Sequence, residues 1–254
     1  MKPSGNTILI TGATAGIGLG LALRFHQAGN KVIISGRRKA LLEQITKDHP
    51  GIESLELDVA DAQSILEASK QIGSLYPDLN VVINNAGIML PENVLEAGSL
   101  KIAEDTIAVN LLGTIRMTHA FLPQLAAKAS SFIINVSSSL AFVPFPSAIT
   151  YSATKAAVHL FTESLRFQLE DTSVRVIEIV PPGVRTTLFG QEGDDNAMPL
   201  EDFLDETMTL LHREETPKEI VVERAKYLRF AEANGKYSDV FAMLAAYKSP
   251  EKTV

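Results

Sequence analysis

The sequence of 254 residues predicts an α/β fold, in which helices cover both faces of a doubly wound parallel sheet. Two observations predict this class. Short β-branched runs alternate along the chain with longer segments of helical period. Several of these runs are apolar throughout and lack the alternation of a half-exposed strand, as expected for strands buried on both faces.

The strands are predicted from runs such as "TILIT", "KVIIS" and "NVVIN". Six strands are expected, at 7–11, 31–35, 53–57, 80–84, 131–137 and 174–180. Helical periodicity between the strands predicts helices at 17–28, 38–47, 61–75, 101–127 and 151–171. Each helical segment is long enough for a right-handed crossover between parallel strands.

After residue 183 the chain becomes acidic and is interrupted by Gly and Pro. This change predicts an excursion from the core at about 186–215 that covers the substrate. Neither an internal repeat nor an interdomain linker is visible, so residues 1–254 are predicted to form a single oxidoreductase domain.

Composition narrows the possible partners. The net charge of −7 and the lack of a dense basic run argue against binding to nucleic acid. The chain has no cysteine, which excludes disulfides and thiolate metal sites and predicts a cytoplasmic protein. No uninterrupted apolar run reaches about 18 residues, so no membrane span is expected.

Three glycines follow the first strand in "TGATAGIG", and a helix begins directly after them. Such a turn exposes backbone N–H groups and the positive end of the helix dipole to an anion. Gly12, Gly16 and Gly18 therefore predict a site for a dinucleotide pyrophosphate in a Rossmann-type sheet, although close packing alone would also favour glycines.

The end of the second strand indicates which dinucleotide binds. A carboxylate there would accept the ribose 2′-hydroxyl of NAD, but the chain has Gly36 followed by Arg37 and Arg38. Guanidinium groups match a 2′-phosphate in charge and geometry, so NADP(H) is predicted. The alternative is that both arginines are solvated residues at the start of a helix.

Tyr151 and Lys155 lie four residues apart on one predicted helix face, in "YSATK". A nearby cation favours the phenolate form of a tyrosine, so Lys155 is expected to lower the pKa of Tyr151. Ser138 closes a buried strand, and Asn110 lies inside an apolar helical segment, where it needs hydrogen-bond partners. Taken singly, each of these residues is also compatible with a structural role.

Together these motifs identify a resemblance that covers most of the chain. The sequence resembles the short-chain dehydrogenase/reductase family in "TGATAGIG", "LDVAD", "NNAGI", "YSATK" and "PPGVRTT", and within it the DltE-like branch. The resemblance implies the strand order 3-2-1-4-5-6. A seventh strand is in doubt, because the chain ends in "AMLAAYKSPEKTV" where many relatives have a further strand and a Gly-rich tail.

The resemblance also implies roles for individual residues. Tyr151 would be the general acid, Lys155 would bind the nicotinamide ribose, Ser138 would hold the substrate oxygen, and Asn110 would hold a water in a proton relay. The implied cofactor-binding residues, which include Tyr151 and Lys155, are otherwise Gly12, Thr14, Gly16, Ile17, Gly18, Arg37, Arg38, Asp58, Val59, Asn85, Ala86, Gly87, Pro182, Gly183, Val184 and Thr186.

The predicted function is an NADPH-dependent carbonyl reductase or alcohol dehydrogenase that acts on an apolar small molecule. Apolar residues expected around the substrate are Met89, Leu90, Phe142, Phe145, Leu188, Phe189 and Met198. Surplus apolar residues on helices 101–127 and 151–171 predict a homodimer. No metal is expected, because His26, His49, His119, His159 and His212 lack ligand spacing.

Two alternatives remain. The same fold with intact cofactor binding would also suit a regulatory protein that binds NADP(H) without catalysis. A sugar-nucleotide epimerase of the extended branch is disfavoured by the glycine spacing and by the short C-terminal part.

Overall fold

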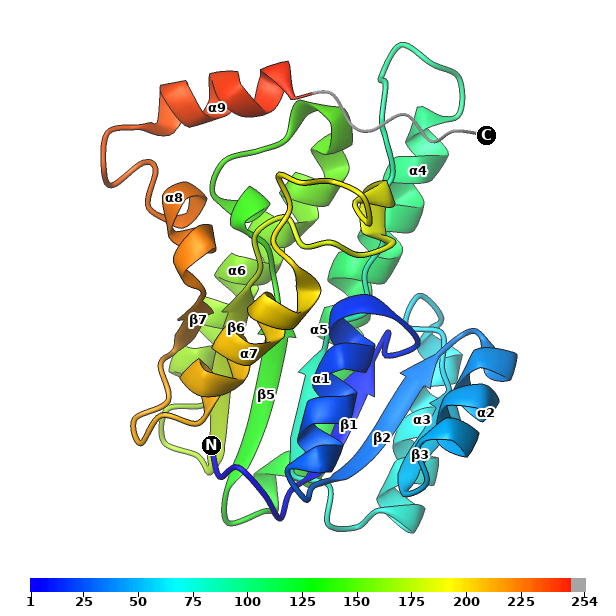
Figure 1. Ribbon diagram of the computed structural model, residues 1–254. Coiled ribbons are helices and arrows are strands. Elements are labelled where there is room, and N and C mark those ends of the chain that lie inside the picture. The colour runs from blue at the N-terminus through cyan, green and yellow to red at the C-terminus, as the bar shows by residue number, and fades with distance from the viewer. Residues whose placement is uncertain (248–254) are drawn as a thin grey trace.

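The computed structural model describes residues 1–247 and shows a sheet with a layer of helices on each face (Figure 1). Within these residues seven parallel strands pair in the order β3-β2-β1-β4-β5-β6-β7. The strands are β1 (Thr7–Thr11), β2 (Lys31–Gly36), β3 (Ile52–Glu56), β4 (Val81–Asn84), β5 (Ser131–Val136), β6 (Val174–Val180) and β7 (Glu219–Val221). The predicted fold class and strand order are confirmed.

The seventh strand, which the sequence left in doubt, is present. It pairs with β6 in parallel register, Ile179 opposite Ile220, and comes before the tail in which it was sought. A strand of three residues is too short to show the alternating pattern of a strand in the sequence. It is recognised as a strand by its hydrogen-bonded pairing with β6 and not by its amino-acid composition.

The helices agree closely with those predicted, except that the segment at 101–127 contains a stretch of π-helix. The main helices are α1 (Gly16–Gln27), α2 (Lys39–Asp48), α3 (Ala62–Leu75), α4 (Ser99–Thr106), α5 (Gly113–Ala126), α6 (Ile149–Gln168), α7 (Leu200–Leu211), α8 (Lys226–Arg229) and α9 (Tyr237–Ala246). Short helical turns are η1 (Ile107–Leu112, the π-helix), η2 (Ser139–Ala141), η3 (Pro146–Ala148), η4 (Leu188–Gly190) and η5 (Glu223–Ala225). In the described part of the chain no helix is both long and apolar enough to cross a bilayer.

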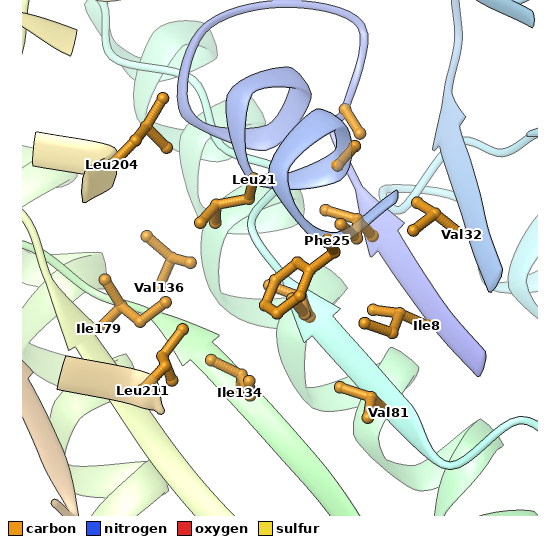
Figure 2. Packing of buried hydrophobic residues seen from close by; sticks show 14 of the residues in the cluster. Ile8, Leu21, Phe25, Val32, Val81, Ile134, Val136, Ile179, Leu204 and Leu211 are labelled. Carbon is orange, nitrogen blue, oxygen red and sulfur yellow. The ribbon is translucent and has the colours of Figure 1, made fainter. Parts of the chain in front are cut away.

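Two apolar layers hold the helices to the sheet. One layer packs α1, α2 and α7 on one face, and the other packs α3, α5 and α6 on the opposite face. Figure 2 shows the first layer, where Phe25 of α1 lies over Ile8 and Val81 from neighbouring strands. Phe25 is fully buried, so its truncation to Ala is expected to cost about 3–5 kcal/mol of stability.

The chain beyond β6 contributes α7 to one face of the sheet and η4 and α9 to the side of the strands' carboxyl ends. The predicted excursion at 186–215 contains η4 and α7, and α7 packs against α1 through Leu204 over Gly20. After β7 the chain turns through α8, and α9 runs beyond the carboxyl ends of β5 and β6 (Figure 1). Val240 of α9 is fully buried against Val143 and Ala231, which fixes the C-terminal helix to the body.

Candidate active site

The turn between β1 and α1 has the backbone that an anion site needs. Gly12 and Gly16 adopt positive φ angles of 66° and 53°, a region that residues with a Cβ avoid. A Cβ at Gly12 would lie 2.7 Å from the Cα of Ala86. Helix α1 begins without a side-chain cap on its first N–H groups and without an acidic residue in its first turn, so these donors remain available to a phosphate.

The end of β4 is tied to this turn by hydrogen bonds. Thr11 Oγ1 accepts from the main-chain N–H groups of Asn85 and Ala86, each at 3.0 Å. Asn85 Nδ2 donates to the carbonyls of Thr11 and Gly12 at 3.0 and 3.2 Å. A Cβ at Gly18 would lie 2.5 Å from that amide nitrogen, so the "NNAG" segment and the glycine turn support each other.

At the end of β2 the side chains are cationic. Arg38 Nη2 donates to Thr14 Oγ1 at 2.5 Å, which places its guanidinium beside the glycine turn. A Cβ at Gly36 would lie 3.2 Å from Thr14 Cγ2, so a carboxylate side chain there would have to displace Thr14. Arg37 is exposed at the rim. This end of the site therefore suits a second phosphate better than a free ribose hydroxyl.

One cavity of about 1300 Å³ joins these parts to the predicted chemistry residues. Its size suits a dinucleotide together with a small substrate. All the predicted site residues except Asn110 line it: Gly12, Thr14, Gly16, Ile17, Gly18, Arg37, Arg38, Asp58, Val59, Asn85, Ala86, Gly87, Ser138, Tyr151, Lys155, Pro182, Gly183, Val184 and Thr186.

Tyr151 and Lys155 come from the first turns of α6, and Ser138 follows β5 as the cap of η2. The Lys155 ammonium lies 5.6 Å from the centroid of the Tyr151 ring and donates to the carbonyl of Val136 at 2.8 Å. Ser138 Oγ accepts from the N–H of Leu140 at 3.1 Å, which fixes the position of the hydroxyl oxygen. Each of the three side chains is buried.

The pKa of Tyr151 differs from the one predicted from the sequence. Burial raises the pKa of Tyr151 to about 12, although a hydrogen bond with Ser138 acts in the opposite direction. Lys155 was expected to lower that pKa, but here its ammonium is bound to Val136 and is itself buried. Burial lowers the pKa of Lys155 to about 8, and the charge of Glu178 partly offsets this. Tyr151 is therefore held protonated, as a proton donor must be.

Asn110 lies behind the cavity, within the π-helix η1. Its amide oxygen accepts from the N–H of Ile88 at 2.8 Å, and its amide nitrogen donates to the Ile88 carbonyl at 2.9 Å and to Thr154 Oγ1 at 3.3 Å. Both amide donors are thus directed at the protein. The π-helix was not expected from the sequence, although such segments occur often at functional sites.

The substrate end of the cavity is apolar. Five of the seven apolar residues predicted there line it: Met89, Leu90, Phe145, Leu188 and Phe189. The predictions for Phe142 and Met198 were wrong, because Phe142 packs on His159 with ring centroids 4.7 Å apart and Met198 joins the core beneath α7. Sequence reasoning missed Asp194, Leu244 and Tyr247, which also line the cavity.

A partly buried ion-pair network lies next to the site, and sequence reasoning missed it as well. Glu178 of β6 lies against His159 Nδ1 at 2.9 Å, and Glu219 of β7 pairs with Arg229 of α8 at 2.7 Å. Ligand atoms of His159, Glu178 and Glu219 lie within 4.8 Å of one another. Glu219 is thus paired with the cation of Arg229, whereas Glu178 has a cationic partner only while His159 is protonated.

Comparison with known proteins agrees with this geometry. A family model described as short chain dehydrogenase matches residues 6–197. The chain is 39% identical over 236 residues to an uncharacterized oxidoreductase DltE of Bacillus subtilis, covering 91% of this chain and 93% of that protein. It is 36% identical over 193 residues to the NADP-dependent 3-hydroxy acid dehydrogenase YdfG of Escherichia coli K12, covering 74% and 77%.

A solved structure extends the likeness to the whole fold. A short chain dehydrogenase from Burkholderia cenocepacia, crystallised in complex with NADP, superposes with a TM-score of 0.82 at 27% identity. The alignment covers 97% of this chain and 100% of that structure.

Proposed function

Since this chain belongs to the short-chain dehydrogenase family, we propose that it is an NADPH-dependent carbonyl reductase acting on a ketone or aldehyde. The observation that carries the proposal is the cavity of about 1300 Å³. It brings Tyr151, Lys155 and Ser138 together with an uncapped helix terminus and two arginines. An acid, a cation and phosphate-binding groups along one surface are what hydride transfer from a nicotinamide dinucleotide requires.

The residues at the glycine turn fit NADP(H). The N–H groups at the start of α1 receive the pyrophosphate, and positive φ at Gly12 and Gly16 lets it approach the backbone. Arg37 and Arg38 receive the 2′-phosphate, in keeping with the NADP named for the Escherichia coli and Burkholderia relatives.

When bound, NADPH supplies the hydride that reduces the carbonyl carbon. Tyr151 donates its proton to the carbonyl oxygen as negative charge develops there, and the Ser138 hydroxyl donates a hydrogen bond to the same oxygen. The Lys155 ammonium stabilises the phenolate left on Tyr151 and returns a proton to it. The raised pKa of Tyr151 suits the reductive direction, because the acid is protonated at neutral pH.

Asn110 supports the site from behind as a positioning residue. Its side chain joins η1 to Ile88 after β4 and to Thr154 beside Lys155. Since its donors are used in these bonds, a relay water is better placed against Lys155 than against the Asn110 amide nitrogen.

The functional unit in this proposal is a homodimer of single-domain subunits. On α6, Leu160 is 61% exposed and Phe167 is 78% exposed, and Ile107 and Leu112 of η1 are also exposed. Because α6 and η1 are neighbours, these side chains lie on one side of the molecule, and a two-fold axis there would cover both copies at once. Light scattering that reports a monomer at micromolar concentration would contradict the dimer.

The proposal is tested by following NADPH absorbance with a panel of ketones and aldehydes, and with NADH as the control cofactor. We expect consumption with apolar carbonyl compounds and a preference for NADPH. If the protein binds NADPH tightly but consumes none with any carbonyl compound, the non-catalytic regulatory function replaces this one.

A further inference from the structure

The C-terminal segment forms a wall of the cavity beside the proposed acid. Leu244 of α9 and Tyr247, which follows it, line the same cavity as Tyr151. The Tyr247 ring meets the edge of Phe145 at 5.9 Å between centroids, and Phe145 meets Phe189 in the same way at 5.7 Å. Tyr247 therefore extends a row of aromatic side chains, Phe189 and Phe145, along the substrate end.

A hydrogen bond closes this wall. The Tyr247 hydroxyl donates to Asp194 Oδ2, which lies in the segment between η4 and α7. Asp194 is 8% exposed, and its other oxygen accepts from the N–H of Asn196 at 2.8 Å. This bond ties the C-terminal segment to the loop between η4 and α7, and both residues line the cavity.

The protonation states of Tyr247 and Asp194 favour the hydrogen bond between them. Burial and the adjacent Asp194 raise the pKa of Tyr247 to about 12, so its hydroxyl stays protonated. Burial alone would raise the pKa of Asp194, but the hydrogen bonds from Tyr247 and Asn196 and the nearby charge of Arg185 leave it below its usual value. Asp194 therefore remains a carboxylate at neutral pH and adds a negative charge to the cavity wall.

Besides Arg37 and Arg38 at the cofactor end, the cations that line the cavity are Lys155 and Arg224. Met89, Phe145 and Phe189 pack with Tyr151 in one apolar cluster. The Lys155 ammonium is bound to Val136 and belongs to the proposed proton transfer. Arg224, from η5, lines the cavity but is exposed and donates to the carbonyl of Asn196 at 2.5 Å.

We propose that Tyr247 and Asp194 determine which substrates the enzyme accepts, an inference that rests on the proposed reductase function. The two residues close an apolar compartment, which selects an uncharged carbonyl compound over one that carries a carboxylate. An alkyl chain gains by leaving water among these aromatic rings. A carboxylate in the same position would lose its hydration and face the charge of Asp194. The two residues thus direct the site away from the hydroxy acids named for the Escherichia coli relative.

The test compares kcat/KM for three substrates of matched length with saturating NADPH: heptan-2-one, 6-oxoheptanoate and the methyl ester of the latter. The ester separates the effect of charge from that of shape. We expect the wild type to prefer the ketone and the ester to the keto acid by at least about tenfold. If the wild type prefers the keto acid, the inference is overturned. If that preference then disappears in Arg224→Gln, Arg224 is the residue that binds the substrate carboxylate.

Variants locate the effect. Asp194→Asn keeps an oxygen for the Tyr247 hydroxyl but removes the charge, so the ratio of ketone to keto acid should fall at least about fivefold. Tyr247→Ala opens the wall, so activity on 6-phenylhexan-2-one should rise relative to heptan-2-one. Tyr237→Phe, at the start of α9 and outside the cavity lining, is the matched control and should keep the wild-type ratios.

The outcomes separate the two proposals. If Asp194→Asn and Tyr247→Ala are both active and keep the wild-type ratios of kcat/KM between substrates, the specificity inference is overturned. The proposed reductase function would then still stand. If the wild type reduces none of the carbonyl compounds although it binds NADPH, the reductase function fails and this inference fails with it.

Discussion

The cofactor end and the substrate end of the cavity are built in different ways. The cofactor end is made from turns that follow adjacent strands, and its Gly12 and Gly18 leave no room for one more carbon. The substrate end is assembled from Met89, Phe145, Phe189 and Tyr247, which lie far apart in the sequence. The family model also ends at residue 197, before α7, α8 and α9. Under the two proposals, the residues that bind the cofactor lie within the part that the family model matches, whereas Tyr247 reaches the substrate end from beyond it.

The largest expected effect is at Tyr151, where the two ends meet. Tyr151→Phe keeps the ring and its packing but removes the proton, so kcat should fall at least about a hundredfold, the scale of general acid catalysis. NADPH affinity, measured by fluorescence titration, should stay near the wild-type value. Lys155→Ala should lower both activity and affinity. Near wild-type turnover by Tyr151→Phe would show that another group donates the proton.

The next prediction tests how tightly the cofactor end is built. Gly12→Ala places a Cβ 2.7 Å from the backbone of Ala86, at a φ of +66°. Such overpacking should destabilise the protein by about 1–3 kcal/mol and weaken NADPH binding. Thermal unfolding and NADPH titration measure the two effects.

Gly73→Ala is the control for that substitution. Gly73 lies inside α3, and a Cβ there meets its nearest neighbour at an ordinary 3.9 Å. Replacing a helical Gly by Ala should therefore stabilise the protein by about 0.5–1 kcal/mol. If Gly12→Ala and Gly73→Ala change the stability and the NADPH affinity equally, the glycine turn is not closely packed against Ala86.

Arg37 offers a smaller, cofactor-specific effect. Arg37→Ala removes a charge-assisted contact worth about 1.5–3 kcal/mol, so NADPH affinity should fall about tenfold or more. NADH affinity should hardly change, because NADH lacks the 2′-phosphate. Calorimetric titration with both cofactors checks this, and equal losses for the two would remove Arg37 from the phosphate site.

The smallest expected effect concerns the pair formed by His159 of α6 and Glu178 of β6. The hydrogen bond to Glu178 raises the pKa of His159 above its usual value, although burial opposes this. The protonated imidazole therefore stabilises the folded state fully below about pH 6.5, and this contribution is lost as the pH rises through the raised folded-state pKa.

His159→Gln keeps a polar side chain but cannot titrate. Urea unfolding between pH 5 and 9 should show wild-type stability declining with pH more steeply than that of the variant. Parallel curves would show that the His159–Glu178 pair does not link its protonation to folding.

Much of the fold and the cofactor end could be predicted, because local physics determines them. A glycine turn after a buried strand, or Tyr151 and Lys155 four residues apart on a helix, is visible within a few residues. Tyr247 could not be assigned to the cavity, since only the tertiary fold brings it to Asp194. The raised pKa of Tyr151 was missed for a related reason, because burial is a property of the assembled site.

The ion pairs around Glu178 also depend on contacts between residues that are distant in the sequence. Glu178 stands out as a charge within the apolar run "VRVIEIV", so a buried carboxylate with a partner was detectable in principle. Its partner His159 lies on α6, one turn beyond Lys155, and spacing along the chain does not reveal that contact.

The central claim is that the one cavity holds both the hydride donor and a carbonyl substrate next to Tyr151. It is tested most directly with NADPH that carries deuterium at both C4 positions, incubated with heptan-2-one and the wild-type protein. Mass spectrometry of the product should find heptan-2-ol with one deuterium on the carbinol carbon, and Tyr151→Phe should form at least about a hundredfold less. Bound NADPH without any deuterated alcohol from this or other carbonyl compounds would contradict the account.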